Sequence, residues 1–436
     1  MTSNEKTKSA ALYERGLKVM PGGCSRNTIL MKPHPEYADF AKGCRVTDIE
    51  GVERIDFSNN MTALIHGHAD EEIIAAVTEQ LAKGTCFTLG TELEVEFAEY
   101  LCSRSQGFEK LRFVNSGTEA VMSGLKAARA YTGRAKIAKV EGAYHGLYDH
   151  AEVSQTSNAD NWGDADNPNS NPVSHGTPQA TLDDVIVLPF NNVEVALSIL
   201  DKHKENIACV LMDLMPHRVG LIPASTEFFE AIHKWTRANG ALILADEVIT
   251  FRSELGGLQD RHSVKPDLTA MGKMVGGGFP VGALAGRAEV MDVMNPLMDK
   301  VLFPHSGTFS ANPITMAAGL TAMKKFDQQA VNDLNAMGDY TRSVLEEAIK
   351  IADAKACVTG TGSMLRIHMR ETAPINYRDN VATPDESVRL KALLNHLFHN
   401  GIIMINTCTA ALSTAITKTE VDRLGEVMLE GLRKTK

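Results

Sequence analysis

The chain has 436 residues, of which 44% are hydrophobic and 22% are charged, and this length predicts two or three domains with a large buried core. No segment approaches the roughly 18 consecutive apolar residues that a membrane span requires, and residues 1–10 are polar, which disfavours a secretory signal. The 44 basic and 54 acidic side chains give a net charge of −10, so the chain lacks the basic surplus of a general nucleic-acid-binding protein.

Seven short apolar segments in the middle of the chain have the composition of buried strands. Several are apolar at every position, as in ALILA at 241–245, and this pattern is typical of a strand covered by helices on both faces. The segments therefore predict a seven-stranded, mostly parallel α/β sheet. They span residues 111–115, 136–141, 184–189, 207–214, 241–248, 268–271 and 283–286.

Helical periodicity surrounds these strands and changes near residue 325. Expected helices before that point span 70–83, 91–104, 118–131 and 227–239, and expected elements after it are helices at 332–351, 385–399 and 418–434 with short strands near 364–369 and 402–406. We therefore expect a large domain at 66–325 and a smaller α+β domain formed by the two chain ends, 1–65 and 326–436.

Residues 154–183 are rich in Asn, Asp, Ser, Pro and Gly and show no periodicity. A structureless segment of this length inside an α/β domain is either a functional loop or a mobile insertion, and both interpretations stay open.

The chain contains seven cysteines, at positions 24, 44, 86, 102, 209, 357 and 408, and no two of them have a C-x-x-C spacing. Neither a disulfide framework nor a zinc site is indicated, so we expect a cytoplasmic protein without a metal.

The end of the first strand has the features of a phosphate site. In an open α/β sheet, ligands bind beyond the carboxyl ends of the strands. Here Ser116, Gly117 and Thr118 stand at the start of a helix, where hydroxyls, backbone N–H groups and the positive end of the helix dipole suit a phosphate. A plain helix N-cap with a glycine turn is the alternative.

Two further strand ends carry an acid and a lysine. Asp246 and Glu247 follow the apolar run at 241–245, and a carboxylate there is costly to bury unless a cation or strong donor meets it; helix capping is the alternative. Lys273 lies in the apolar, glycine-rich run MGKMVGGG at 271–278, where desolvation lowers the pKa of the amine and leaves it nucleophilic. A surface lysine is the alternative there.

A phosphate cradle, a buried acid and a desolvated lysine are the three features that pyridoxal 5′-phosphate (PLP) requires. Its phosphate needs an anion site, its pyridine nitrogen an acidic partner and its aldehyde a lysine. The glycine run at 276–278 matches neither of the common nucleotide-binding motifs, so a nucleotide is disfavoured.

Five segments occur together, in order, over nearly the whole chain: NSGTEA at 115–120, EGAYHG at 141–146, DEV at 246–248, PDLT at 266–269 running on to Lys273, and HSGTF at 305–309 with NP at 312–313. With these segments the sequence resembles the class III aminotransferases of PLP fold type I. It is similar in particular to the branch that holds glutamate-1-semialdehyde aminomutase and the β-amino-acid aminotransferases.

The resemblance implies a role for each candidate residue. Lys273 would hold PLP covalently and carry the proton between the substrate Cα and the cofactor, and Asp246 would keep the pyridine nitrogen protonated. Ser116, Gly117 and Thr118 would hold the phosphate.

The same resemblance places Tyr144 against one face of the cofactor ring and Val248 against the other, with His145 among the cofactor contacts. Gly307 and Thr308 would reach the phosphate from the partner subunit, so the active unit would be a homodimer with shared active sites.

The sequence departs from the family pattern after the fourth strand. Where relatives usually have Glu-Pro and then a Gln or Asn on the cofactor's phenolic oxygen, this chain reads DLMPHR at 213–218. Asp213 is one methylene shorter than Glu, although it stays an expected cofactor contact, and Pro216 cannot replace a Gln. Arg218 falls where some relatives have Asn, so it would meet the phenolic oxygen, a substrate carboxylate or only solvent.

Two features bear on the substrate. The aminomutase branch tends to carry an acidic residue near 406–410, but this chain reads NTCTA there, which disfavours the haem-pathway aminomutase activity. Arg26, in MPGGCSR at 20–26, occupies the position at which the Arg of a similar run in β-amino-acid aminotransferases contacts the substrate carboxylate. An exposed loop arginine without a ligand is the alternative.

The resemblance therefore implies a PLP-dependent aminotransferase that moves an amino group between an amino carboxylate, with β-amino acids as candidates, and a keto acid in a ping-pong cycle. An aminomutase or an amino-acid epimerase would use the same lysine. A PLP-fold protein that only binds or regulates is disfavoured, because both Lys273 and Asp246 are present. The expected partners are these small molecules and a second copy of the chain, with no nucleic acid and no membrane.

Overall fold

The structure is a computed structural model that describes residues 7–435, and its centre is a seven-stranded sheet of order β4-β12-β11-β10-β9-β5-β8. Every neighbouring pair is parallel except those of β12, which is antiparallel to β11 and β4. The predicted sheet is therefore confirmed. Its strands are β4 (Lys110–Val114), β5 (Lys136–Val140), β8 (Val185–Leu188), β9 (Ile207–Asp213), β10 (Leu242–Asp246), β11 (Leu268–Gly272) and β12 (Gly282–Gly286).

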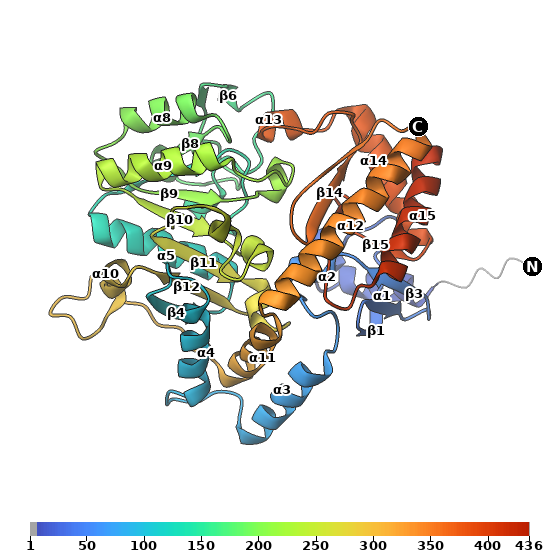
Figure 1. Cartoon of the computed structure of the whole chain (residues 1–436), viewed down its shortest axis with the longest axis horizontal. Helices are drawn as coiled ribbons and strands as arrows, with labels where there is room; N and C mark the ends of the chain where they lie inside the picture. Colours follow the sequence, from blue (N-terminus) through green and yellow to red (C-terminus); the bar gives the residue numbers. More distant parts are fainter. Residues whose placement is uncertain (1–6, 436) are drawn as a thin grey trace, which may run out of the picture.

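Helices cover both faces of this sheet, which explains why its central strands are apolar throughout (Figure 1). All seven residues of β9 and all five of β10 are buried. Alternate residues of β10 face opposite layers: Leu244 packs with α5 (Gly117–Thr132) and Ile243 with α9 (Thr226–Asn239). The strand period of two thus fills two cores with one apolar run.

The N- and C-terminal parts of the chain share a second sheet, because β15 (Ile402–Ile403) pairs in parallel with β3 (Glu53–Asp56). Three long helices pack beside it, on the right of Figure 1. The boundaries at residues 65 and 325 stay predictions. The other elements here are β1 (Ala38–Lys42), β2 (Arg45–Asp48), α12 (Gln328–Ala352), β13 (Cys357–Thr359), β14 (Met364–His368), α14 (Pro384–His399), β16 (Thr409–Ala411) and α15 (Lys418–Lys434).

The sequence patterns locate most long elements within a few residues of their bounds. The expected strand at 402–406 is shorter, because the chain turns at once to pair Ile405 with Thr409. The patterns did not reveal β1 to β3, which are short and half exposed. The remaining helices are α1 (Lys8–Leu17), α3 (Glu71–Lys83), α4 (Glu92–Ser103), α6 (Asp149–Glu152), α8 (Val193–Lys202), α10 (Ala288–Met291), α11 (Pro313–Lys325) and α13 (Tyr377–Asn380). Within residues 7–435 no helix is long and apolar enough to cross a bilayer.

The prediction of a structureless segment at 154–183 is wrong in part. The segment forms a two-strand hairpin, β6 (Gly163–Asp164) with β7 (Asn167–Pro168), and a short helix, α7 (Gln179–Asp183). Its polar side chains bind its own backbone, as in the 2.9 Å bond from Asn169 Nδ2 to Asn161 O. These bonds carry no periodicity, so the sequence pattern could not reveal them.

Helix α13, from the C-terminal part of the chain, fastens this segment to the large sheet (Figure 1). Arg378 forms a bidentate ion pair with Glu141, at 2.9 and 3.1 Å, and donates to the carbonyls of Trp162 and Gly163 at 2.8 and 2.7 Å. The hydroxyl of Tyr377 donates to Ser157 O at 2.7 Å. The segment is therefore built into the structure, which favours the functional loop over the mobile insertion.

Residues 59–62 form one turn of left-handed helix, labelled α2 (Asn59–Thr62) in Figure 1. Their φ angles are 46°, 50°, 57° and 76°. For residues other than glycine this conformation costs about 1–2 kcal/mol each, although Asn tolerates it best. Such a turn persists only when its surroundings stabilise it.

Glycines allow elements of this fold to approach more closely than any side chain would permit. A Cβ on Gly338 in α12 would lie 2.0 Å from the carbonyl oxygen of Gly362. We expect Gly338→Ala to lower the free energy of unfolding by about 2 kcal/mol, because this overlap outweighs the helix propensity gained. Gly90→Ala is the matched control, since nothing lies within 4 Å of the added methyl group. Urea denaturation of both variants checks the prediction, and a Gly338→Ala protein as stable as the wild type would contradict it.

Candidate active site

The register of the parallel strands brings two acids and a lysine to one edge of the sheet. Asp213 is the last residue of β9, Asp246 is the last residue of β10, and the two are directly paired across the ladder. Lys273 follows the last residue of β11, the next strand along. The three side chains that the sequence singled out at separate strand ends therefore converge.

Lys273 has a positive φ of 50°, which turns the chain sharply out of β11. Burial lowers the pKa of its amine, and the negative charges of Asp246 and Asp213 oppose this decrease. Desolvation is the larger effect, so the amine gives up its proton more readily than an exposed lysine. This is the expected environment of a nucleophilic lysine.

Asp246 is buried and accepts two hydrogen bonds. His145 Nδ1 lies 2.7 Å from its Oδ2, and the backbone N–H of Val248 donates to its Oδ1 at 3.0 Å. Burial lowers the pKa of His145, although the Asp246 carboxylate opposes this decrease, and the contact suits an Nδ1–H that donates to Oδ2. Its Nε2 is buried and has no hydrogen-bond partner among residues 7–435. His145 thus stands behind Asp246 and orients it.

Asp213 shares the buried edge with Asp246. Burial and the neighbouring Asp246 charge raise the pKa of Asp213 well above its usual range. One of its oxygens, Oδ1, accepts the Met215 N–H at 2.8 Å. Asp213 therefore holds a proton more easily than an exposed aspartate does.

Glu247, the residue after Asp246, makes its side-chain hydrogen bonds with the loop that follows β10 and not with Asp213 or Lys273. Its carboxylate accepts the N–H groups of Leu258 and Gln259 at 3.1 and 2.8 Å and the hydroxyl of Thr250. Burial raises the pKa of Glu247 to about 7. Glu247 therefore anchors the start of the short helical turn Leu258–Arg261, so the helix-capping alternative applies to Glu247.

Ser116, Gly117 and Thr118, the expected anion cradle, stand at the start of α5, as the sequence predicts, and their binding of an anion stays a prediction. Ser116 is the N-cap, and its hydroxyl accepts the Glu119 N–H at 3.1 Å. Gly117 and Thr118 are the first two residues of the helix, and their N–H groups have no acceptor within the helix. A Cβ on Gly117 would lie 2.8 Å from Val248 Cγ2. Only glycine lets this helix end come so close to Val248.

An aromatic and cationic cluster lies beside the strand ends. The ring of Tyr144 meets His217 edge-on, at 6.0 Å between centroids, and the Arg218 guanidinium stands 5.8 Å from the same ring. Burial and the charges of Lys273 and Arg218 lower the pKa of His217 to about 3. Sequence reasoning did not assign His217, whose only signal was its place directly before Arg218.

Three predicted residues stand apart from this group. Arg26, Gly307 and Thr308 are exposed, and within residues 7–435 none of them hydrogen-bonds to another predicted site residue. Arg26 contacts Asn60, and a Cβ on Gly307 would lie 3.6 Å from Asn115 Nδ2.

Lys139 was also missed, because it lies inside a strand rather than at its end. It is fully buried, and its Nζ donates to the carbonyls of Ala143 and Val153 at 3.1 and 2.7 Å. These bonds tie β5 to the loop before α6, which carries Tyr144 and His145, and to Val153 directly after α6.

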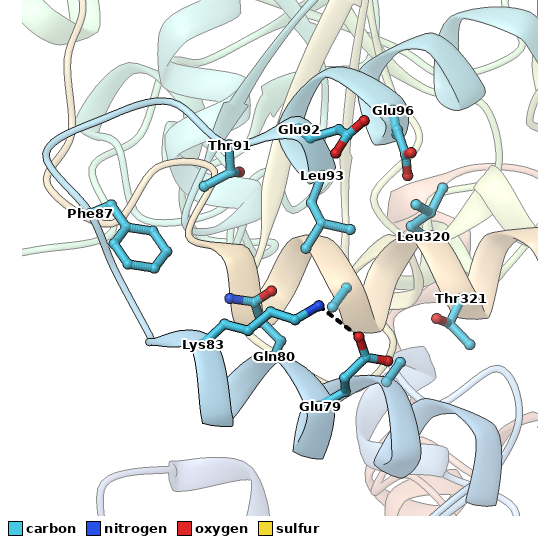
Figure 2. A pocket seen from close by; sticks show the side chains of 12 residues that line it. Glu79, Gln80, Lys83, Phe87, Thr91, Glu92, Leu93, Glu96, Leu320 and Thr321 are labelled. Carbon is cyan, nitrogen blue, oxygen red and sulfur yellow. Dashed lines mark hydrogen bonds and ion pairs between the residues drawn. The ribbon is translucent and has the colours of Figure 1, made fainter.

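A cavity of about 390 Å³ lies elsewhere, between α3, α4 and α11 (Figure 2). Glu79 and Lys83 form an ion pair at its side, 2.6 Å apart. None of the predicted site residues lines this cavity.

The residues at the strand ends fit PLP. The α5 N-terminus suits its phosphate, Asp246 suits a protonated ring nitrogen, and Lys273 suits its aldehyde. The buried Nε2 of His145 has no hydrogen-bond partner within residues 7–435, so this region keeps a polar atom that an additional group could meet.

Comparison with known proteins gives matches to PLP-dependent enzymes over most of the chain. The model of the aminotransferase class-III family matches residues 32–432. Glutamate-1-semialdehyde 2,1-aminomutase of Methanothermobacter thermautotrophicus is 35% identical over 398 residues, which is 91% of each chain.

Solved structures are also similar. An omega-transaminase from Sphaerobacter thermophilus superposes with a TM-score of 0.97 and 43% identity, covering 99% of this chain and 98% of the other. A transaminase with PLP bound superposes with a TM-score of 0.91 and is 38% identical, covering 98% of this chain and 97% of the other. A beta-phenylalanine aminotransferase from Variovorax paradoxus superposes with a TM-score of 0.86 and is 31% identical, covering 97% of this chain and 93% of the other.

Lys139 predicts a dependence of stability on pH. Burial lowers the pKa of Lys139 from 10.5 to about 7, so between these values the unfolded chain binds a proton that the folded chain has lost. The free energy of unfolding therefore rises with pH across this window and gains about 2 kcal/mol between pH 7 and pH 9. Lys139→Met should lose this gain, whereas the exposed Lys234→Met should keep it. Urea denaturation at the two pH values measures both; equal pH dependence in all three proteins would contradict the prediction.

Proposed function

Because the chain belongs to the class III aminotransferases, we propose that it transfers an amino group between an amino carboxylate and a keto acid, in two half-reactions at one site. Its cofactor is pyridoxal 5′-phosphate. When bound, PLP supplies an electron sink for the bonds of the substrate carbon that carries the nitrogen.

The observation that carries the proposal is the convergence of Lys273, Asp246 and the α5 N-terminus at one edge of the sheet. Lys273 would hold the cofactor and then act as the base at the substrate Cα, since burial lowers the pKa of its amine. Asp246, oriented by His145, would face the positive ring nitrogen. Ser116, Gly117 and Thr118 would bind the phosphate, as expected of a helix N-terminus.

Other residues of the cluster would enclose the cofactor ring. Tyr144 would lie on one face and Val248 on the other, and Asp213 would contact the ring from the neighbouring strand end. The close approach of Val248 to Gly117 supports its place beside the phosphate. Arg218, held over Tyr144, would meet the phenolic oxygen or a substrate carboxylate.

We propose a β-amino acid as the amino donor. Two observations support this: Arg26 stands in the run that would contact the substrate carboxylate, and a structure 31% identical to this chain is a beta-phenylalanine aminotransferase. The absence of an acidic residue between 400 and 419 weighs against the aminomutase reaction.

An aminomutase is the second candidate, because a glutamate-1-semialdehyde 2,1-aminomutase is 35% identical to this chain. It would use Lys273 in the same way but return the amino group to the same molecule. An epimerase would also release no keto acid. Net release of a keto acid from the amino donor, together with loss of the cofactor's visible absorbance, distinguishes transamination from both.

We further propose that the active unit is a cytoplasmic homodimer. Gly307 and Thr308 are exposed, as expected for residues that would reach the phosphate of the partner subunit's site. Seven cysteines without a C-x-x-C spacing suit a reducing compartment.

A panel of amino donors, scored by loss of the visible absorbance of the bound cofactor, tests the proposed reaction. We expect an amino carboxylate to bleach the wild-type holoenzyme and the added keto acid to restore the absorbance. Lys273→Ala should abolish turnover, because it removes the amine that would hold the cofactor and carry the proton. Circular dichroism controls for folding; substantial turnover by a folded Lys273→Ala protein would end the proposed mechanism.

The role of Arg26 predicts a selective defect. Its planar guanidinium suits a carboxylate, to which it can donate two parallel hydrogen bonds. We expect Arg26→Ala to raise the apparent KM for amino carboxylates by an amount worth about 1.5–3 kcal/mol, as for hydrogen bonds between charged groups. Amines without a carboxylate should be little affected. Equal losses for both classes of donor would remove Arg26 from the substrate site.

A further inference from the structure

We propose that Asn60 is a positioning residue that holds the Arg26 guanidinium ready for the substrate carboxylate. The inference rests on the role proposed above for Arg26 and adds the residue that orients it. Arg26 Nη1 donates to Asn60 Oδ1 at 2.7 Å, across 34 residues of chain.

The neutral amide is the right kind of partner for this task. Within residues 7–435 no carboxylate lies within ion-pair distance of Arg26. An amide oxygen fixes one N–H of the guanidinium and leaves its positive charge uncompensated, whereas a carboxylate would compete with the substrate. The pair therefore keeps Arg26 both oriented and able to bind an anion.

Asn60 can orient Arg26 because its own backbone is fixed. It is the second residue of the left-handed turn, with a φ of 50°, and asparagine is among the few residues that adopt this conformation readily. Asp56 Oδ1 accepts the N–H groups of Ser58 and Asn59 at 2.8 and 3.0 Å. Asn59 Nδ2 donates to Ala411 O at 2.7 Å, which ties the turn to the C-terminal part of the chain.

The same turn adjoins the lysine segment. The N–H of Leu64 bonds to Asn59 O at 3.0 Å, and Leu64 Cδ2 would lie 3.2 Å from a Cβ on Gly278. Gly278 belongs to the glycine run directly after Lys273. The element that presents Asn60 is thus packed against the loop that follows the catalytic lysine of the proposed reaction.

The effect of this contact falls on substrate binding rather than on folding. Both side chains are exposed, so their hydrogen bond contributes little to stability. Arginine has several rotatable bonds, and ordering it before the substrate arrives removes part of the entropy cost of binding. Asn60 should therefore affect KM for carboxylate donors and leave kcat nearly unchanged.

The test compares β-phenylalanine with 1-phenylethylamine, which lacks the carboxylate, as donors for the wild-type and variant holoenzymes. Asn60→Gly keeps the left-handed backbone and removes the acceptor, so KM for β-phenylalanine should rise roughly three- to tenfold, the factor for ordering one long side chain. Asn60→Asp should raise the same KM by pairing with Arg26, and added salt should reduce this increase. For 1-phenylethylamine, all KM values should stay within about twofold of wild type.

Two further variants separate positioning from a general structural effect. Asn191 has a φ of 57° and lies in the loop before α8, so Asn191→Gly is the matched control and should leave both KM values unchanged. In an Arg26→Ala background, Asn60→Gly should have no additional effect, because the residue it orients is absent.

The outcomes distinguish this inference from the proposed function. If Arg26→Ala impairs β-phenylalanine selectively and Asn60→Gly does not, Asn60 has no positioning role while the proposed function stands. An Asn60→Gly defect that is equal for both donors, or that persists in the Arg26→Ala background, also overturns the inference. If the wild-type holoenzyme accepts neither donor, the β-amino-acid proposal fails and the inference fails with it.

Discussion

The structure depends on placing charged groups where water is scarce, at the carboxyl ends of three adjacent buried strands. Asp213 and Asp246 are paired across the ladder, and Lys273 leaves the next strand beside them. A buried carboxylate is costly when no donor or cation meets it, because its desolvated charge is left uncompensated. His145 and the Val248 N–H reduce this cost for Asp246 by donating to its two oxygens. The stability of this edge and its chemistry therefore have the same origin.

Glycines allow close packing next to the sheet edge that carries Asp213, Asp246 and Lys273. A Cβ on Gly277 would lie 2.4 Å from Ala318 O, and one on Gly319 would lie 2.3 Å from Val275 O, so α11 and the segment after Lys273 pack backbone to backbone. A Cβ on Gly282 would lie 2.0 Å from Ser116 O, which brings β12 against the start of α5. Such contacts leave few alternative arrangements for the lysine and the anion cradle, as a preorganised site requires.

The sequence reveals most of this arrangement, because apolar runs and the polar residues that end them are local signals. The strand ends at Asp213 and Asp246 and the helix start at Ser116 could all be located from them. Contacts between segments that are distant in the sequence could not be located from such local signals. Nothing near Lys139 indicates that it binds two loop carbonyls, and nothing in residues 154–183 indicates that Arg378 would hold them. Likewise, the sequence does not distinguish the roles of Asp246 and Glu247. The structure does, because the Glu247 carboxylate accepts the N–H groups of Leu258 and Gln259.

The same division explains why relatives with different reactions resemble this chain almost equally. Asp213, Asp246 and Lys273 lie at or directly after the ends of sheet strands, whereas Arg26 and Arg218, the proposed substrate contacts, lie on connecting segments. Segments of that kind can change substrate contacts without disturbing the core. The strained turn at 59–62 joins the two parts, since it is held by Asp56 and Ala411 and contacts Arg26. A strained backbone persists where the surrounding structure determines its position, and here that position fixes the acceptor of the Arg26 guanidinium, the proposed contact of the substrate carboxylate. The choice among aminotransferase, aminomutase and epimerase therefore depends on the residues around the sheet edge more than on the edge itself.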